Sequence, residues 1–319
     1  MTSILRRWTF KVMRSKPIVK ATELTKKLVL PGFSGLTLYQ VVKFSWAGIQ
    51  KGRITNRAAA VSFRILLSLP PVLIVLLSII PFIPIENFQE NLLMYISKTM
   101  PENAYSLVEQ TLNDLITKKQ QTLISISFIL ALFYASNAIQ AILDGFSYSY
   151  NIEKPHSIII QYARSFGLML VFSFAMTIGV ALITFSGPVL AYLQELNIIG
   201  GDLIVFLIEF AKWILVIVLF EIAISLLYRA GHSGKWRAIN AGAAFATLGF
   251  IIVSSLFGWY VNSFATYNKL YGSVGTVLVV MLWLYFNSIV LLIGFEINAA
   301  IARAKNQPVS DIEPDDVLN

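Results

Sequence analysis

The chain of 319 residues contains no cysteine and only two histidines, His156 and His232. The lack of cysteine excludes disulfide bonds and thiolate metal sites. The two histidines fall in separate predicted loops, so they do not supply the three protein ligands of a catalytic zinc site. No Ser-His-Asp set and no nucleotide-binding motif occurs either. We therefore expect no metal, no cofactor and no catalytic residues, and the chain is predicted not to be an enzyme.

Charged side chains are also scarce, at 13% of the residues, whereas hydrophobic residues make up 56%. Soluble globular domains carry about 25% charged residues, and the mean hydropathy of this chain is +0.70. In a soluble protein, the net charge of +8 would suggest a nucleic-acid partner. Here most of that charge precedes the first apolar run. The sequence therefore predicts a polytopic membrane protein with no nucleic-acid partner.

Six apolar runs predict an all-α bundle of six transmembrane helices, contained in residues 57–303. At about 1.5 Å per residue, each run is long enough to cross a hydrocarbon core about 30 Å thick. The predicted spans are residues 58–80, 122–143, 161–192, 203–228, 238–261 and 272–302. The third span is expected to bend or end at Gly187-Pro188. The segment from Gly272 to Gly275 is expected to form a tight turn at the entry to the sixth.

The segments outside these spans differ in composition. Residues 1–56 are predicted to form a basic amphipathic region, because Met1 to Arg57 contains 12 Lys or Arg and a single acid, Glu23. Helical spacing of apolar residues over 36–52 favours a helix on the membrane surface. Two further amphipathic helices are predicted in the outer-face loop, residues 83–121. Residues 304–319 form an acidic tail that we expect to be disordered.

The positions of Lys and Arg predict the orientation in the membrane. The N-terminal region, the loop at 229–237 and the end of the last span are basic and share one side with the loop at 144–160, whereas the segments between them are acidic or nearly uncharged. Basic loops stay in the cytoplasm. Six spans with both termini in the cytoplasm satisfy this rule at every loop.

The first span contains an arginine and a pair of prolines. Burying Arg64 within hydrocarbon costs about 3 kcal/mol or more, so we expect it to have a partner. Pro70-Pro71 deletes two backbone donors and is predicted to break or kink the helix. The carbonyls freed near Leu66 and Leu67 are then expected to be satisfied by water or by a polar neighbour such as Asn137.

Several polar side chains are predicted to share one depth in the membrane. Counting from the basic residue at the end of each span places Arg64, Glu221 and Glu296 about 10–12 Å inside the cytoplasmic ends. We predict that Arg64 pairs with Glu221 or Glu296, either directly or through one water. The expected lining of a cytoplasm-facing polar cleft is Arg64, Asn137, Gln140, Arg164, Glu221, Asn240 and Glu296. The alternative, which stays open, is a buried ion pair that only fixes helix packing.

One further charged pair lies near the outer end of the fourth span. Glu209 and Lys212 are i,i+3 neighbours, and we interpret them as a surface pair.

Three groups of motifs resemble the YihY/BrkB family of bacterial inner-membrane proteins. They are AAAVSF at 58–63 with LSLPP at 67–71; LYR at 227–229 with WR at 236–237 and AGA at 241–243; and YN at 267–268, YGSVG at 271–275, WLY at 283–285 and LIGFEINA at 292–299. The similarity covers residues 57–302. One departure is Ala230-Gly231, where relatives usually have a proline; it affects only the expected shape of that loop.

The resemblance implies an inner-membrane location and, for some members, movement of lipid A precursors or other lipids. We therefore expect a transporter or flippase of a lipid or amphiphilic anion, with membrane lipids, such as an anionic phospholipid or lipid A precursor, as partners. A homo-oligomer is compatible with this expectation. The alternative is a non-transport scaffold or assembly factor of the cell envelope. An older label of the family as a ribonuclease is disfavoured, because the predicted aqueous loops lack a metal-binding cluster.

Overall fold

The computed structural model of the chain describes residues 25–26, 28–29, 35, 37–51, 53–82, 87–99, 102–119, 121–147, 149, 158–196, 202–231, 240–263 and 267–306. Within these ranges the chain is almost wholly helical and has no strand. Six helices are long and apolar enough to cross a membrane. They are α4 (Ile54–Ile79), α7 (Gln121–Ser147), α8 (Ile158–Glu195), α9 (Asp202–Gly231), α10 (Ala241–Ser263) and α11 (Tyr267–Asn306). The predicted all-α class with six spans is confirmed.

The predicted amphipathic segments are also helical. They form α3 (Leu38–Lys51), α5 (Phe88–Thr99) and α6 (Glu102–Thr117), and a short 3-10 turn, η1 (Ile80–Phe82), follows α4. The start of α3 is a capping box, in which the amide of Thr37 donates to Gln40 Oε1 and the amide of Gln40 donates to Thr37 Oγ1. The apolar face of α3 packs Val41 against Ile301 of α11. Most of the basic arm and the acidic tail lie outside the described residues.

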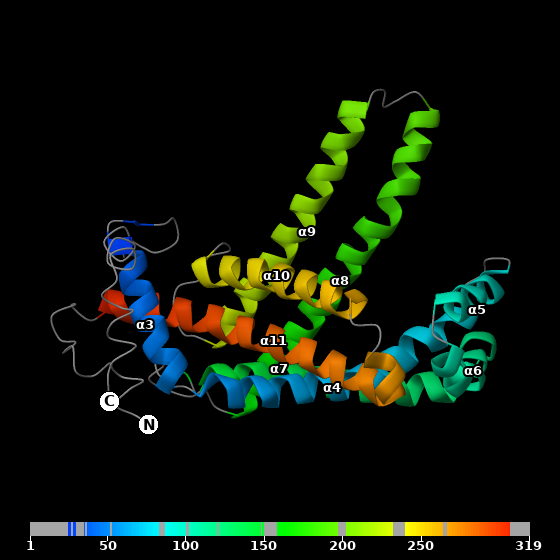
Figure 1. Ribbon diagram of the computed structural model, residues 1–319, viewed down its shortest axis with the longest axis horizontal. Coiled ribbons are helices and arrows are strands. Elements are labelled where there is room, and N and C mark those ends of the chain that lie inside the picture. The colour runs from blue at the N-terminus through cyan, green and yellow to red at the C-terminus, as the bar shows by residue number, and fades with distance from the viewer. Residues whose placement is uncertain are drawn as a thin grey trace.

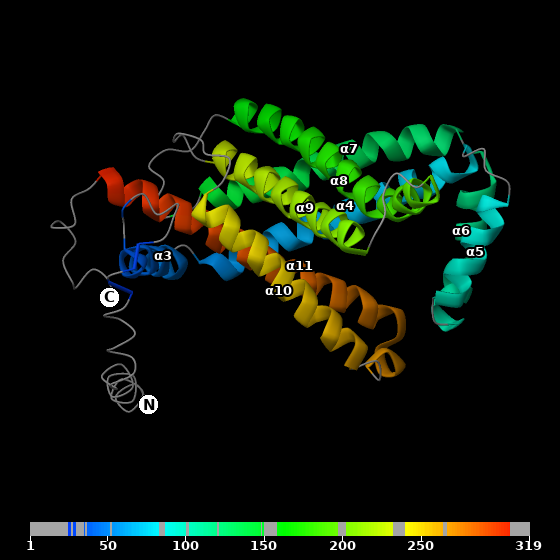
Figure 2. The same ribbon diagram turned by 90° about the horizontal axis from the view of Figure 1, so that it is seen from above.

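The main core lies where α4, α7, α9, α10 and α11 meet (Figures 1 and 2). At its centre the rings of Phe146 and Phe295 are stacked with 4.0 Å between centroids, and Tyr228 meets both rings edge-on. The Tyr228 hydroxyl donates to the Leu291 carbonyl at 2.7 Å, so this buried polar group is satisfied. An aromatic cluster thus joins α7, α9 and α11.

The small residues of α10 allow it to lie very close to α11. A Cβ atom built on Gly294 would lie 2.6 Å from the Gly242 carbonyl oxygen, so neither glycine leaves room for a side chain. Ala243 and Ala246 are fully buried at the same crossing. Small residues of this kind permit close contact between transmembrane helices.

Helices α8 and α9 form a hairpin whose far half leaves the bundle (Figure 1). Near its base, α8 lies against α7 and α9 lies against α10, whereas the outer half of the hairpin extends away from the other helices (Figures 1 and 2). The exposed side chains there are large and apolar, as Phe206, Phe210 and Trp213 illustrate. Its surface is therefore available to lipid or to another protein.

None of three predicted interruptions ends a helix. Both Pro70 and Pro71 lie inside α4, α8 continues through Gly187-Pro188, and α11 begins at Tyr267 and runs through the predicted turn. The physical reason is that hydrocarbon offers no partner for a free backbone group, so a continuous helix is the least costly backbone even where proline deletes a donor. The expected helix break at Pro70-Pro71 is wrong, and the alternative of a kink there stays a prediction. The prediction about the carbonyls of Leu66 and Leu67 stays a prediction.

Candidate functional site

A buried ion pair joins the first and last spans. Arg57 Nη2 lies 2.9 Å from Glu296 Oε1, and the two side chains are 8% and 0% exposed. Arg57 Nη1 donates to the Gly145 carbonyl at 2.7 Å, and Ser149 Oγ donates to Glu296 Oε2 at 2.7 Å. We call Arg57, Glu296, Ser149 and the Gly145 carbonyl the sealed cluster. Each Glu296 oxygen has a donor, as a charge removed from water requires.

The sealed cluster corrects the predicted partner of Glu296. Counting residues from the helix ends puts Arg64 at the depth of Glu296 only if Arg57 and Arg303 lie at the same height. In the structure, α11 continues ten residues beyond Glu296, whereas α4 begins only three residues before Arg57. The two helix ends are therefore not level. As a result, Arg57 lies beside Glu296 and Arg64 lies two turns further along.

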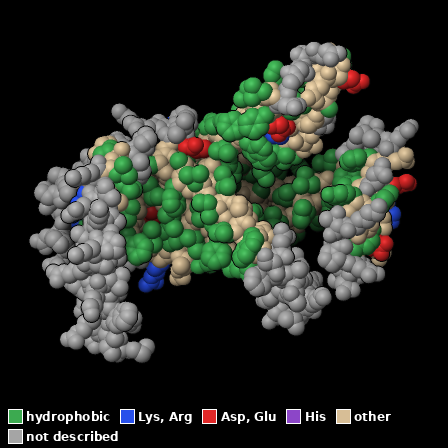
Figure 3. Space-filling view, turned by 45° about the horizontal axis from the view of Figure 1, so that its top comes forward, with side chains coloured by type: hydrophobic (Ala, Val, Ile, Leu, Met, Phe, Trp, Pro, Cys, Tyr) green, Lys and Arg blue, Asp and Glu red, His purple; other side chains and the backbone are tan. Residues whose placement is uncertain are grey.

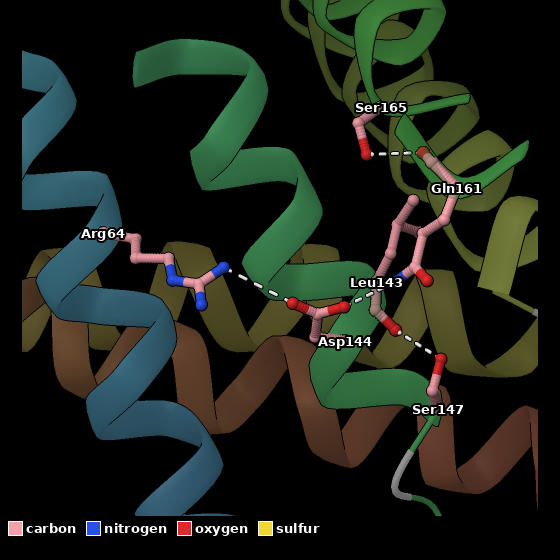
Figure 4. Close-up of polar contacts among 6 residues, drawn as sticks. All are labelled: Arg64, Leu143, Asp144, Ser147, Gln161 and Ser165. Carbon is pink, nitrogen blue, oxygen red and sulfur yellow. Dashed lines mark hydrogen bonds and ion pairs between the residues drawn. The ribbon is translucent and has the colours of Figure 1, made fainter. Parts of the chain in front are cut away.

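Arg64 pairs instead with Asp144 of α7, as Figure 4 shows. Its Nη1 atom lies 3.4 Å from Asp144 Oδ2, and Gln161 Nε2 of α8 donates to the other carboxylate oxygen at 2.6 Å. The side chains of Arg64 and Asp144 are 46% and 37% exposed. We call Arg64, Asp144 and Gln161 the open cluster, because three helices bring these groups together without covering them.

The surroundings of the open cluster satisfy their own polar groups. Ser165 Oγ donates to the Gln161 carbonyl at 2.8 Å, and Ser147 Oγ donates to the Leu143 carbonyl at 3.0 Å (Figure 4). These serines therefore do not compete for the carboxylate of Asp144. Asp144 was predicted only as the end of the second span, although its position seven residues after Asn137 puts it on the same helix face.

The other predicted residues of α7 and α8 lie on the same elements as the open cluster but do not join it. Gln140 is buried, and its Oε1 atom has no hydrogen-bond partner in the described part of the chain. Asn137 is partly buried one turn away. Arg164, which is exposed, donates through Nη1 to the Ala230 carbonyl at 3.3 Å and so links α8 to the end of α9.

Glu221 and Asn240 belong to a third group, at the start of α10. Asn240 Oδ1 accepts from the amide of Ala243 at 2.8 Å and caps the helix, while Asn240 Nδ2 donates to Ser225 Oγ at 2.7 Å. Asn298 Nδ2 donates to the same Asn240 oxygen at 2.6 Å. The Glu221 carboxylate faces the Asn240 backbone, and its Oε1 atom is buried without a hydrogen-bond partner. We call these four side chains the cap cluster.

The polar side chains that were predicted to share one depth in the membrane therefore fall into three separate clusters. Among the described residues, no ion pair joins Arg64 to Glu221 or Glu296, and the prediction of such a pair is wrong. The sealed cluster has no free face for a ligand. The open cluster presents a half-exposed guanidinium, whose fork of donors matches the oxygens of a phosphate or carboxylate.

The described residues show no candidate metal-binding site. Within them, no group of three or more His, Cys, Asp or Glu side chains is placed to hold a metal ion. His156 and His232 lie outside the described residues.

A last polar group lies on the α8–α9 hairpin. Lys212 Nζ pairs with the Glu209 carboxylate, as the i,i+3 spacing suggested, and also donates to Ser186 Oγ of α8 at 3.1 Å. Lys212 is 12% exposed and Glu209 is 37% exposed.

Comparison with known proteins gives matches over most of the chain. Residues 45–316 match the family model described as virulence factor BrkB. The ribonuclease-like protein YfkH of Bacillus subtilis (strain 168) is 32% identical over 79% of this chain and 92% of its own length. The UPF0761 membrane protein Smlt0865 of Stenotrophomonas maltophilia (strain K279a) is 24% identical, and the match covers 84% of this chain and 62% of that protein. No solved structure matches the chain.

Proposed function

The chain belongs to the virulence factor BrkB family, and we propose that this integral membrane protein moves a lipid or an amphiphilic anion across the membrane. The observation that supports the proposal is the open cluster. A half-exposed arginine, paired with a carboxylate that in turn accepts a hydrogen bond from an amide, lies within the predicted first span. A charge at that depth is costly unless it meets a polar partner or ligand. An anionic headgroup is such a ligand.

In this proposal Arg64 is the main contact for the headgroup. Asp144 orients the guanidinium through one nitrogen, at 3.4 Å, and leaves the other donors available. The carboxylate also keeps the empty site close to neutral, so no tightly bound counter-ion has to leave first. Arg164 is exposed on the neighbouring helix α8 and adds positive potential that attracts anions.

The competing proposal is a scaffold or assembly factor of the cell envelope. The sealed cluster favours it, because a fully buried Arg57–Glu296 pair has no access to a ligand and acts on helix packing alone. A protein in which every intramembrane charge served packing would need no transported substrate. The exposure of Arg64 and Asp144 is the feature that this alternative does not explain.

The remaining parts of the proposal concern chemistry and location. We propose that the protein is not an enzyme, uses no cofactor and has no nucleic-acid partner, in spite of the ribonuclease-like name of the Bacillus relative. We also propose a bacterial inner-membrane location with both termini in the cytoplasm, as the positive-inside rule predicts.

The test is lipid binding and lipid transfer by purified protein. Native mass spectrometry in mild detergent should show bound anionic phospholipid, and reconstituted vesicles should move a fluorescent anionic lipid between leaflets. Arg64→Gln should weaken both by about tenfold, equivalent to ~1.4 kcal/mol. Arg53→Gln, which removes an exposed charge from the turn that precedes the same helix, is the matched control and should change neither. If Arg64→Gln binds and transfers lipid as the parent does, the scaffold proposal replaces transport.

A further inference from the structure

We infer that the α8–α9 hairpin is a docking surface for a second copy of this chain. The starting observation is the pair Glu209–Lys212, which occurs on a helix that is otherwise apolar from Leu203 to Phe220. Lys212 lies about 15 Å along the axis from Asp202 and about 25 Å from Arg229. Both charges therefore fall within the length of α9 that a hydrocarbon core about 30 Å thick would cover.

The pair is not fully satisfied within one chain. Lys212 Nζ contacts Glu209 and Ser186, but only one oxygen of Glu209 has a partner among the described residues, and this side chain is 37% exposed. Lipid tails offer no donor to that oxygen. A surface that presents it in the membrane is therefore better covered by a protein that brings a cation.

The surroundings of the pair resemble the centre of an interface. Phe206, Glu209 and Trp213 follow i, i+3, i+7 spacing and share one face of α9, and both aromatic side chains are more than half exposed. Exposed aromatics are enriched where subunits meet. Figure 3 shows the hairpin as mainly hydrophobic, with few charged side chains.

Helix α8 also has unfilled space that its own chain does not use. A Cβ atom added at Gly179 or Gly187 would meet no atom within 4 Å. Glycine lowers helix stability by about 1 kcal/mol relative to alanine. Two glycines without a packing contact in their own chain are suited to the close approach of another helix.

A second copy is the partner because the charges are self-complementary. In a two-fold arrangement, Glu209 of each chain faces Lys212 of the other, so one contact supplies the missing donor for both carboxylates. A different protein would need to provide the same charges by chance. The inference does not depend on the proposed transport.

Crosslinking in native membranes tests the interface, because the chain has no cysteine of its own. We expect Phe206→Cys, treated with a short bismaleimide, to give a covalent product of two chains. Leu248→Cys, on the exposed face of α10, is the matched control and should stay monomeric. A product with a protein of another mass, or no product from Phe206→Cys, would overturn the inference in favour of a foreign partner or of lipid.

Charge reversal separates a contact between chains from the contact within one chain. In the Phe206→Cys background, Glu209→Lys alone and Lys212→Glu alone should each lose the covalent dimer. Co-expression of the two variants with tags of different size should restore a mixed dimer, although the pair within each chain remains broken. If the single reversals crosslink like the parent, or if the mixed pair fails to form, Glu209 and Lys212 do not join two subunits.

Discussion

At the scale of single residues, two arginines seven positions apart in α4 have different environments. Arg57 is buried and has a carboxylate and a carbonyl as partners, whereas Arg64 is half-exposed and has a longer contact with Asp144. The energetic consequences differ accordingly. Removing one member of the buried pair strands a charge that cannot move, whereas the half-exposed Arg64 can shift toward water or a lipid headgroup.

We therefore predict that Glu296→Leu destabilises the protein by about 3–5 kcal/mol, because Arg57 would be left buried without its counter-charge. The measurement is reversible unfolding of purified protein in mixed micelles. Asp144→Leu, which removes the partner of Arg64, is the comparison and should cost less, because the half-exposed Arg64 can still reach toward water or a lipid headgroup. The double variant Arg57→Met/Glu296→Leu should recover most of the loss. Equal losses for Glu296→Leu and Asp144→Leu would contradict the assignment of the buried pair.

At the scale of elements, α10 and α11 cross at very short range, with Gly242 beside Gly294. Two glycines make this crossing possible, and the Asn298 side chain strengthens it by accepting from the amide of Gly242 at 2.9 Å. A Cβ on Gly294 would meet the Gly242 carbonyl and the Tyr228 hydroxyl, and neither of these is a loose side-chain end. The helices would have to separate to admit it.

Gly294→Val should accordingly lower the free energy of unfolding by about 1–3 kcal/mol, through overpacking at this crossing. The thermal unfolding of detergent-purified protein gives the measurement. Gly258→Ala is the control, because α10 has open space at that position, and it should leave the unfolding temperature unchanged or raise it. A Gly294→Val protein as stable as the parent would show that α10 and α11 are further apart than described.

At the scale of the whole molecule, the described chain combines a packed bundle with a projecting hairpin (Figure 1). Six crossings would place the two ends of the membrane domain on one side of the membrane, and the basic segments predict that this side is the cytoplasm. Helix α3 packs against the end of α11, which keeps the segment before the first span beside the end of the last.

This orientation predicts a labelling pattern for single cysteines. Tyr95→Cys, on the exposed face of α5, should react with a membrane-impermeant maleimide in intact cells whose outer membrane has been made permeable. Trp46→Cys, on the exposed face of α3, should react only after the inner membrane is opened. Labelling of Trp46→Cys in sealed cells would place the basic region on the outer face and contradict the topology.

The sequence alone determined the all-α class, the number of spans and the existence of the three amphipathic helices. These features follow from hydropathy and periodicity, which are local, and from the requirement that every backbone group in hydrocarbon find a partner nearby. The same local signals wrongly predicted that helices end at Pro70-Pro71 and Gly187-Pro188. Proline breaks helices less readily in hydrocarbon, because no water competes there for the backbone groups.

Only the tertiary structure decided which charges meet. Arg64, Glu221 and Glu296 were assigned to one layer by counting from helix ends, but α4 and α11 end at different heights, and Glu296 pairs with Arg57. The partner of Arg64 is Asp144, which hydropathy assigned to a span end. Depth along one helix follows from the sequence, whereas the relative height and rotation of two helices depend on side-chain packing between them, here on contacts such as Gly242 with Gly294 and Phe146 with Phe295.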